Sequence, residues 1–366
     1  MKKILIIVED YTKFGGVEKV TANMSSMFVN NDFPIWGVLS LHKENDISLI
    51  DYNKNLNIEV VKRQNVTNFI ESKGITDVIL QIGSLKEASC IVNKLYGKVA
   101  IISILHSTPY AYTKYILEKS TWKDWLSFFK KELLVRFINI FFFKNIIKKS
   151  KFFLTVSKKG VKELEDILNN SYKNVDYIYN LIPNVYTSLK KFGEKENIIL
   201  YGGRLDKNKR VFETVKYLSS LLKKRAAWEY YILGDGDEYE EIQEYITNNS
   251  IENIKLIGFK KNIYEYLSKS KICLLYSLYE GLPTILVEAG MYKNVLISYN
   301  STSGVSDIIL NNENGFIVNN EKELIEKIEL LMDNEDLLNR MAESNYINEN
   351  FHCDKILDKW KKILDL

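Results

Sequence analysis

The chain has 366 residues, of which 46 % are hydrophobic and 27 % charged, and its formal net charge is +3. This composition is ordinary for a globular protein and excludes a collagen-like or largely disordered chain, and the length predicts about two domains. The net charge is too small to indicate a nucleic-acid partner. Three cysteines lie far apart, at Cys90, Cys273 and Cys353, so neither a disulfide framework nor a zinc site is predicted.

The first residues lack the pattern of a secretory signal, because the apolar run at 4–8 is short and is followed by two acids. No run in the chain approaches the ~18 uncharged apolar residues typical of a transmembrane helix. We therefore expect a cytoplasmic protein.

Short β-rich apolar runs alternate with helical stretches, which predicts two Rossmann-like α/β domains, each a doubly wound parallel sheet. The predicted strands are 3–8, 35–41, 58–61, 77–82, 99–105 and 152–157, then 198–201, 230–233, 254–257, 272–276, 295–298 and 316–318. A polar segment at 187–197 predicts the linker. The domains are therefore expected at 1–190 and 191–345, facing each other across a deep cleft, with ligands at the carboxyl ends of the strands.

The charge is divided unevenly, with a net +9 in residues 1–190 and −6 in residues 191–366. This asymmetry indicates that the first half faces an anionic surface. Solvated helix faces of unequal charge are the alternative.

The segment 201–210 follows a predicted strand and precedes a predicted helix. Glycines such as Gly203 allow a tight turn, from which Arg204 and Lys209 would project at the strand end. Two cations beside a helix start fit a diphosphate, whose charge must be balanced in a partly dry site. The alternative is a solvated basic turn.

Asp235 and Asp237 follow the next strand and permit two interpretations. They would form an Asp-x-Asp clip for Mg²⁺, or a strand-to-helix turn whose acids favour a helix N-terminus. We favour the turn.

The segment 277–290 combines a Gly-x-Pro turn with a helix that is predicted to begin near Pro283. Glu280 precedes this helix, Glu288 lies in its second turn, and both carboxylates are expected along one cleft wall. A phosphate could bind the amides at the helix start, which belong to Leu282, Thr284 and Ile285. A nucleotide sugar, with hydroxyls at both ends of a diphosphate, fits this set. The alternative is a capped helix with two surface acids.

Two features of the first half point to the same cleft. Gly15 and Gly16 lie between the first strand and a helix predicted over 17–29, and His106 ends the strand 99–105. The alternatives are a plain helix start and a hydrogen-bonded structural histidine.

Together these motifs resemble the retaining glycosyltransferases of family 4, which have the GT-B fold. The pieces that match in order and spacing over 198–318 are Gly203-Arg204-Leu205 with Lys209, Gly234-Asp235-Gly236, Gly258-Phe259, Ser277, Glu280 with Glu288, and Asn314-Gly315. The first half matches more loosely, through Gly15-Gly16-Val17-Glu18, His106, Ser157 and Asn180. The resemblance also implies that a terminal helix, here 346–366, crosses back to the first domain.

The resemblance implies roles for individual residues. Arg204 and Lys209 would hold the diphosphate, Glu280 the hydroxyls of the donor sugar, and Glu288 the ribose. The remaining donor-binding residues would be Gly15, Gly16, Gly203, Gly281, Leu282, Thr284 and Ile285, with Phe259 and Lys260 reading the base through main-chain atoms. The catalytic set would be Arg204, Lys209, Glu280 and His106. The sequence departs from the family at Arg210, where a glycine is usual, and at 301–304, where consecutive glycines are usual.

The sequence shows neither a Ser-His-Asp set nor a carboxylate pair of glycosidase type. We therefore expect catalysis by positioning and by charge stabilisation of a departing nucleotide diphosphate, without a metal or cofactor. The resemblance implies retention of configuration, and we expect a UDP-sugar donor. The alternatives are a GT-B-type nucleotide-sugar epimerase and a non-catalytic homologue that partners another transferase.

Residues 119–150 hold eight basic and two acidic residues with aromatic residues between them. This composition is typical of a pair of interfacial helices on anionic lipid, and the alternative is helices that pack on the first domain. We expect a peripheral protein of the inner face of the cell membrane. Its acceptor would be a glycan, a polyprenyl-diphosphate-linked glycan or another lipid, in bacterial surface polysaccharide (such as capsule) or glycolipid synthesis.

Overall fold

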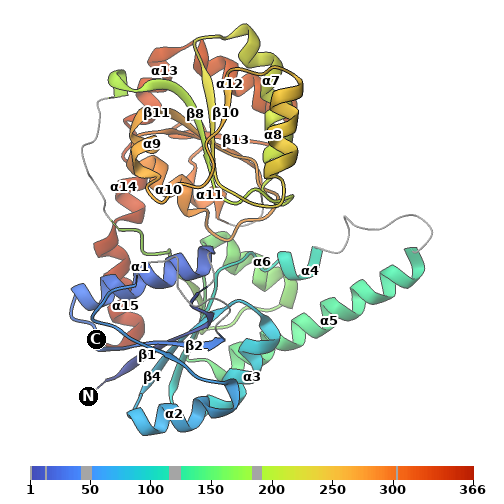
Figure 1. Cartoon of the computed structure of the whole chain (residues 1–366). Helices are drawn as coiled ribbons and strands as arrows, with labels where there is room; N and C mark the ends of the chain where they lie inside the picture. The colour runs from blue at the N-terminus through green and yellow to red at the C-terminus, as the bar shows by residue number, and fades with distance from the viewer. Residues whose placement is uncertain (1, 13–14, 43–51, 115–124, 184–191, 302–303) are drawn as a thin grey trace. The chain divides into compact units, whose positions relative to one another are not determined.

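The computed structural model describes residues 2–12, 15–42, 52–114, 125–183, 192–301 and 304–366, without the side chains of 113–114 and 125–133. The chain forms two compact units (Figure 1). Unit 1 is Met1–Pro183 with Cys353–Leu366, and unit 2 is Asn184–His352. Each is a parallel-sheet α/β domain, which confirms the predicted fold class. The predicted boundaries at 190 and 345 lie a few residues from those of the units, and part of the predicted linker falls outside the described residues.

The parallel sheet of unit 1 has the order β3-β2-β1-β4-β5-β6-β7. Its strands are β1 (Ile4–Asp10), β2 (Ile35–His42), β3 (Asn57–Val60), β4 (Asp77–Ile82), β5 (Ala100–Leu105), β6 (Phe152–Thr155) and β7 (Val175–Tyr177). Six agree with the predicted strands to within a few residues. The sequence does not predict β7, because three residues with a central aspartate make no apolar run.

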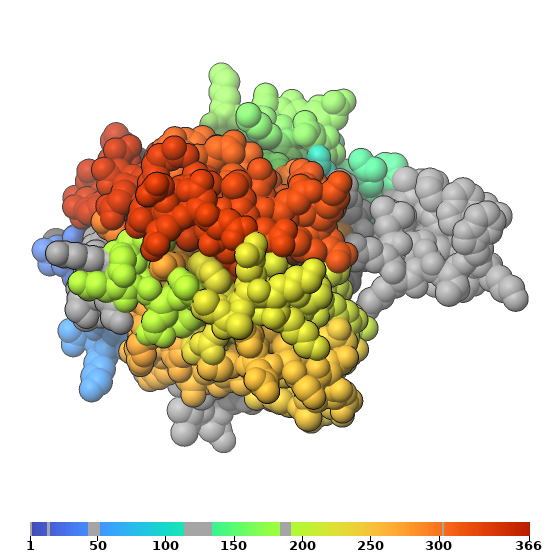
Figure 2. Space-filling view, turned by 90° about the horizontal axis from the view of Figure 1, so that it is seen from above, coloured from blue at the N-terminus to red at the C-terminus, as the bar shows by residue number. Residues whose placement is uncertain are grey.

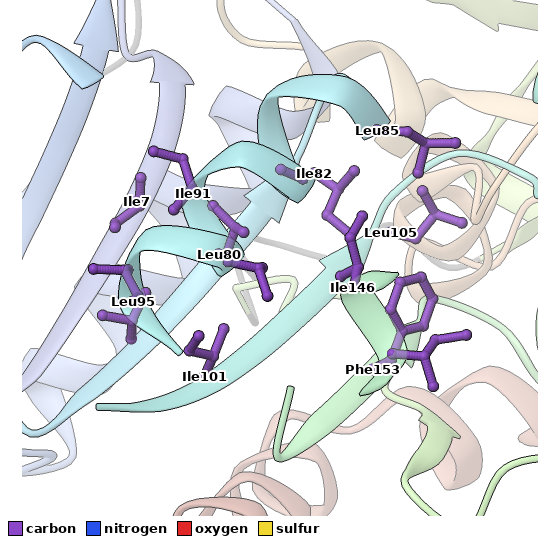
Figure 3. Close-up of a cluster of buried hydrophobic side chains, with 14 of the residues drawn as sticks. Ile7, Leu80, Ile82, Leu85, Ile91, Leu95, Ile101, Leu105, Ile146 and Phe153 are labelled. Carbon is purple, nitrogen blue, oxygen red and sulfur yellow. The ribbon is translucent and has the colours of Figure 1, made fainter. Parts of the chain in front are cut away.

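Helices cover both faces of this sheet, so every residue of the central strand β4 is buried. The helices are α1 (Gly16–Asn30), α2 (Val66–Lys73), α3 (Leu85–Leu95), α4 (Ala111–Lys114), α5 (Trp125–Lys149) and α6 (Lys158–Leu168), with a 3₁₀ turn at Arg63–Asn65. Figure 3 shows Leu85, Ile91 and Leu95 of α3 beside strand residues such as Leu80 and Ile101 in one apolar cluster.

One long helix, α5, stands where the sequence predicts a helix pair, so that prediction is wrong in the described residues, and 119–124 lie outside them. The C-terminal part of α5 enters the core through Phe143, Ile146 and Ile147. The rest extends past the edge of unit 1 (Figure 1). Among the helices of the described residues, none combines the length and apolarity needed to cross a bilayer.

The sheet of unit 2 has the parallel order β10-β9-β8-β11-β12-β13. Its strands are β8 (Glu196–Gly202), β9 (Glu229–Leu233), β10 (Ile254–Leu256), β11 (Ser270–Leu275), β12 (Val295–Tyr299) and β13 (Gly315–Val318), all close to the predicted ranges. The helices are α7 (Val211–Lys224), α8 (Tyr239–Asn248), α9 (Tyr264–Lys269), α10 (Thr284–Met291), α11 (Val305–Ile308), α12 (Glu321–Met332), α13 (Glu335–Ala342) and α14 (Tyr346–Phe351). At one face of this unit α7 lies between α8 and α12 (Figure 2).

The chain end forms two helices instead of the one predicted over 346–366. The backbone leaves the helical conformation at His352, with φ −63° and ψ 134°, so α14 ends there and α15 (Cys353–Leu364) begins. Helix α14 belongs to unit 2 and α15 to unit 1. Trp360 of α15 is buried edge-on against Phe28 of α1, with 5.3 Å between ring centroids.

A buried lysine fixes several elements of unit 2 to one another. Lys195 follows the 3₁₀ turn Phe192–Glu194, and its ammonium donates to the carbonyl oxygens of Leu267, Ser270 and Tyr292 at 3.1, 2.8 and 2.7 Å. Tyr292 ends α10 and Leu267 lies in the last turn of α9, where the helix dipoles favour a cation. Lys195 therefore holds the C-terminal end of the helix whose N-terminal end reaches the candidate site.

We expect Lys195→Met to lower the free energy of unfolding of unit 2 by about 2–4 kcal/mol, because three carbonyls lose a charged donor. Urea unfolding of the full chain measures this. Lys322→Met, at an exposed lysine of α12, is the control and should change the value by less than about 0.5 kcal/mol. Equal stability of the two variants would contradict the assignment.

Candidate functional site

The loops that follow β8 and β9 are joined through their main chains. Gly203 N–H donates to Leu233 O, Leu205 N–H to Asp235 O, and Glu238 N–H to Leu205 O, at 2.9 to 3.0 Å. A Cβ atom at Gly234 would lie 1.8 Å from Gly203 O. The glycine is therefore required by this close approach, and the segment 234–237 is the turn expected in front of α8.

The structure brings Lys209 and Glu280 together. The ammonium Nζ lies 2.6 Å from Oε1 of Glu280, and the two side chains are only 18 % and 11 % exposed. Lys209 comes from the loop after β8 and Glu280 from the loop after β11, its neighbour in the sheet. The carboxyl edge of unit 2 therefore carries a half-buried ion pair.

Asn208, which the sequence does not single out, fixes the backbone around this pair. The side-chain amide of Asn208 donates through Nδ2 to Tyr279 O and accepts through Oδ1 from Tyr279 N–H, both at 3.1 Å. The main-chain carbonyl of Asn208 accepts from Leu278 N–H at 2.8 Å. Three hydrogen bonds thus join the two loops directly beside Lys209 and Glu280.

The other two charged candidates are placed differently. The Arg204 side chain is 67 % exposed, and its guanidinium lies 3.6 Å from the carboxylate of Asp206. Glu288 is buried in α10. Burial raises the pKa of Cys273 to about 12, and the Glu288 carboxylate adds to that shift, which places the two side chains near each other.

Helix α10 begins one residue later than predicted, because Pro283 is its N-cap and Thr284 its first residue. The first turn of a helix leaves its amides without helical acceptors, and those of Thr284 and Ile285 are in this turn. The main-chain carbonyl of Gly281, two residues before the N-cap Pro283, accepts a hydrogen bond from Gly304 N–H at 2.9 Å. A Cβ atom at Gly304 would lie 2.3 Å from Gly281 O, so glycine is needed there for the loop after β12 to approach α10.

Arg210 explains one departure from the family pattern. It is the N-cap of α7 and has φ +53° and ψ +38°, a conformation that favours glycine. Its guanidinium carbon lies 4.5 Å from the ring centroid of Tyr276 and 5.0 Å from that of Tyr299. These cation–π contacts offset a backbone cost of about 1–2 kcal/mol.

Phe259 and Lys260 lie on the loop after β10, where both are exposed. The preceding Gly258 has φ +77°, and its carbonyl accepts from Gly234 N–H at 3.1 Å. The three loops after β8, β9 and β10 are therefore adjacent, in the order that the sheet gives.

In unit 1, Gly15 is the N-cap of α1, and a Cβ atom there would lie 2.4 Å from a Glu18 carboxylate oxygen. Gly16 is the first residue of the helix and has open space around it. Ser157 caps α6 by accepting from Gly160 N–H at 3.1 Å, which is a structural role.

His106 directly follows β5. Burial lowers the pKa of its imidazole to about 4, and a hydrogen bond with the Asn180 side chain offsets part of this by raising the pKa. The ring is therefore neutral at pH 7.

An acidic cluster lies behind the Arg204–Lys209 loop. Burial raises the pKa of Glu238 to about 6, with further contributions from the carboxylates of Glu213, Glu241 and Asp206. Within the described part of the chain, no three His, Cys, Asp or Glu side chains are grouped closely enough to hold a metal ion.

Residues 188–347 match the model of the glycosyl transferases group 1. This segment belongs to that family. The match contains the paired loops, the ion pair and α10, and it supports the family resemblance seen in the sequence.

Three curated relatives of this group 1 segment are glycosyltransferases. An uncharacterised glycosyltransferase of Haemophilus influenzae is 30 % identical over 187 residues, which are 50 % of this chain and 53 % of that protein. A Campylobacter jejuni enzyme named as a diNAcBac-PP-undecaprenol α-1,4-N-acetyl-D-galactosaminyltransferase is 29 % identical over 47 % of this chain and 48 % of its own length. The chain thus spans about half of each of these. The amylovoran biosynthesis glycosyltransferase AmsD of Erwinia amylovora is 24 % identical over the whole of both chains.

Among solved structures, a mutant of S. aureus TarM in complex with fondaparinux, α-GlcNAc-glycerol and UDP has a TM-score of 0.77 at 14 % identity, over the full length of both chains. At this identity the likeness shows the fold alone. It confirms the predicted GT-B fold.

We expect Glu238→Gln to stabilise the protein at pH 8 by about 1 kcal/mol, because the folded pKa of about 6 exceeds the ordinary 4.5 and solvent screens part of that difference. The raised pKa means that the fold favours the protonated carboxyl, so wild-type stability falls as the pH rises through about 6. Urea unfolding at pH 5 and pH 8 measures the effect, which should be smaller at pH 5. Glu240→Gln, at an exposed position of α8, is the control. The same gain at both pH values would contradict the prediction.

Proposed function

We propose that the protein is a retaining, family 4 glycosyltransferase that moves a sugar from a UDP-sugar to a hydroxyl of a glycan or lipid-linked acceptor. The observation that carries this proposal is the Lys209–Glu280 pair at the carboxyl ends of β8 and β11, within a segment that belongs to the glycosyl transferases group 1. An ammonium beside a carboxylate supplies a partner for phosphate oxygens and a partner for sugar hydroxyls within one small region.

In this proposal unit 2 binds the donor. The diphosphate lies against Lys209 and the first turn of α10, where the amides of Thr284 and Ile285 add positive potential. The exposed side chain of Arg204 turns from Asp206 onto the phosphates. Glu280 accepts hydrogen bonds from hydroxyls of the transferred sugar, and Glu288 from those of the ribose. The base lies on the loop that contains Phe259 and Lys260.

Unit 1 is proposed to bind the acceptor, and its proposed substrate-contacting residues are Gly15, Gly16 and His106. A neutral His106 hydrogen-bonds a substrate hydroxyl and is not an acid–base group at pH 7. The acceptor oxygen bonds to the anomeric carbon while the bond from that carbon to the diphosphate breaks, and the hydroxyl proton passes to the leaving phosphate oxygen. Approach from the side of the leaving group retains the configuration. Lys209, Arg204 and α10 supply the balancing charge, so no metal is required.

The relatives support this class of substrate. The name of the Campylobacter relative states an undecaprenol-diphosphate-linked acceptor, and that of the Erwinia relative states synthesis of amylovoran. We propose a similar place for this chain in bacterial surface polysaccharide or glycolipid synthesis.

We further propose that α5 brings the protein to the inner face of the membrane. Leu134, Phe137 and Phe141 are 59 %, 60 % and 66 % exposed, and their spacing puts them on one helix face. Along the same face basic residues follow, with half-buried Lys144 about 4.5 Å and exposed Lys148 about 10.5 Å beyond Phe141 along the helix. Residues 134–149 contain four basic and no acidic residues. Because every charged residue of this stretch is basic, the face would repel a second copy of itself, whereas an anionic lipid surface matches both the charge and the apolar residues.

We expect Lys209→Ala and Glu280→Gln each to lower donor turnover by about 10²–10³-fold, because each removes a partner of the departing diphosphate or the sugar. A screen of nucleotide sugars with a lipid-linked acceptor, followed by product analysis, measures this. Lys207→Ala removes an exposed charge from the same loop and is the matched control. Activity of both variants within twofold of wild type would refute the proposed site. Turnover of the donor to an isomeric nucleotide sugar without acceptor would indicate the epimerase, and absence of nucleotide binding the non-catalytic homologue.

We expect Phe137→Ser/Phe141→Ser to weaken sedimentation with phosphatidylglycerol vesicles at every salt concentration, because apolar contact is lost. Lys144→Gln/Lys148→Gln should weaken it mainly at low salt and leave a smaller salt dependence. Leu330→Ser and Lys223→Gln/Lys224→Gln, at exposed positions of unit 2, are the controls. Binding of both α5 variants equal to that of wild type would exclude this surface.

A further inference from the structure

The residue that follows Lys209 also binds the loop after β11. Arg210 comes directly after Lys209, and Tyr276 lies four residues before Glu280, the partner of Lys209. The guanidinium carbon of Arg210 is 4.5 Å from the ring centroid of Tyr276 and 5.0 Å from that of Tyr299, the last residue of β12. The ion pair and the cation–π stack therefore join the same two loops side by side.

The two tyrosines are the groups that hold the Arg210 side chain. Tyr276 is only 1 % exposed, and its ring centroid lies 5.9 Å from that of Tyr217 of α7 and 5.0 Å from that of Tyr299. The Arg210 side chain makes no capping hydrogen bond at α7, and within the described residues its guanidinium has no ion-pair partner. Contact with the aromatic rings therefore fixes its position.

The backbone of Arg210 points to a role for this side chain beyond packing. Its φ of +53° is one that glycine adopts freely, and other residues keep such a conformation only where their surroundings fix them, often at functional sites. The Arg210 carbonyl accepts from Thr214 N–H at 3.2 Å, and Lys209 N–H donates to Asp206 O at 2.9 Å. Lys209 thus lies between a turn and a helix start, and Arg210 sets the geometry of that start.

We propose that Arg210 is a positioning residue for Lys209. Its stack on Tyr276 and Tyr299 holds the start of α7 against the ends of β11 and β12, and so keeps the Lys209 ammonium beside Glu280 before a diphosphate binds. This inference rests on the proposed function, in which Lys209 contacts the donor. The structural alternative is a stack that stabilises the start of α7 and leaves the ion pair unaffected. The two differ in whether replacing Arg210 changes what Lys209 contributes.

A double-mutant cycle on urea unfolding of the full chain tests this without a ligand. Arg210→Gly suits the backbone conformation and removes the stack. Lys209→Ala should lower the urea midpoint of the wild type, and in the Arg210→Gly background it should lower it by less than half as much, because the ion pair is already loosened there. Ser250→Gly is the matched control, since Ser250 is exposed and also has a positive φ, of 48°. In that background Lys209→Ala should have its full effect.

Binding of UDP to the full chain, measured by titration calorimetry, is the second readout. We expect Arg210→Gly to weaken binding about tenfold when Lys209 is present and less than about twofold in the Lys209→Ala background, because the ammonium that Arg210 positions is then missing. Arg210→Lys keeps a cation on the two rings and should restore part of the affinity. Ser250→Gly should bind UDP as the wild type does.

Equal effects of Lys209→Ala on the urea midpoint with and without Arg210 overturn the proposal. So does a loss of UDP affinity on Arg210→Gly that is the same in both Lys209 backgrounds, or no loss at all. If Arg210→Gly does not fold, Arg210→Gln takes its place in both cycles and the same outcomes decide. If the unfolding cycle shows the coupling but the wild-type chain binds no UDP, the proposed function fails and the positioning of Lys209 by Arg210 stands.

Discussion

The ion pair between Lys209 and Glu280 is the interaction on which the candidate donor site depends. Opposite charges at 2.6 Å in a half-buried place hold two loops that come from neighbouring strands. Asn208 adds hydrogen bonds to the backbone on either side of Leu278 and Tyr279. The position of each charged group is therefore fixed before a ligand arrives, which is the condition for strong electrostatic stabilisation in an active site.

Close main-chain contact provides the frame around this pair. Gly234 and Gly304 stand where any side chain would collide with a carbonyl group of the adjoining loop. Arg210 takes a backbone conformation that suits glycine and is held there by the faces of two tyrosines. At this edge of the sheet the loops are joined to one another by main-chain hydrogen bonds. A substitution in one loop will therefore shift the loop beside it.

Most of the fold could be predicted from the sequence, because buried parallel strands are continuous runs of β-branched and apolar residues. The exceptions have local causes: β7 is too short to form such a run, and one extended residue, His352, divides the terminal helix. Lys209 and Glu280 could be predicted because each lies in a recognisable strand-to-helix loop. The role of Asn208 could not, since an asparagine in a loop does not indicate which main-chain groups its side chain will bond. Arg204 shows the limit of such motifs, which place a residue on a loop but do not fix the direction of its side chain.

The assignment of α15 to the N-terminal unit has a consequence for how the chain acquires its structure during synthesis. Unit 2 is one continuous stretch and has all of its sheet once residue 318 has left the ribosome. Unit 1 is completed only when Trp360 is made, because until then the ring of Phe28 has Phe33 beside it but lacks its second aromatic neighbour. The part of the protein that is translated first is therefore completed last, and during that interval its exposed apolar surface is open to chaperones and to aggregation.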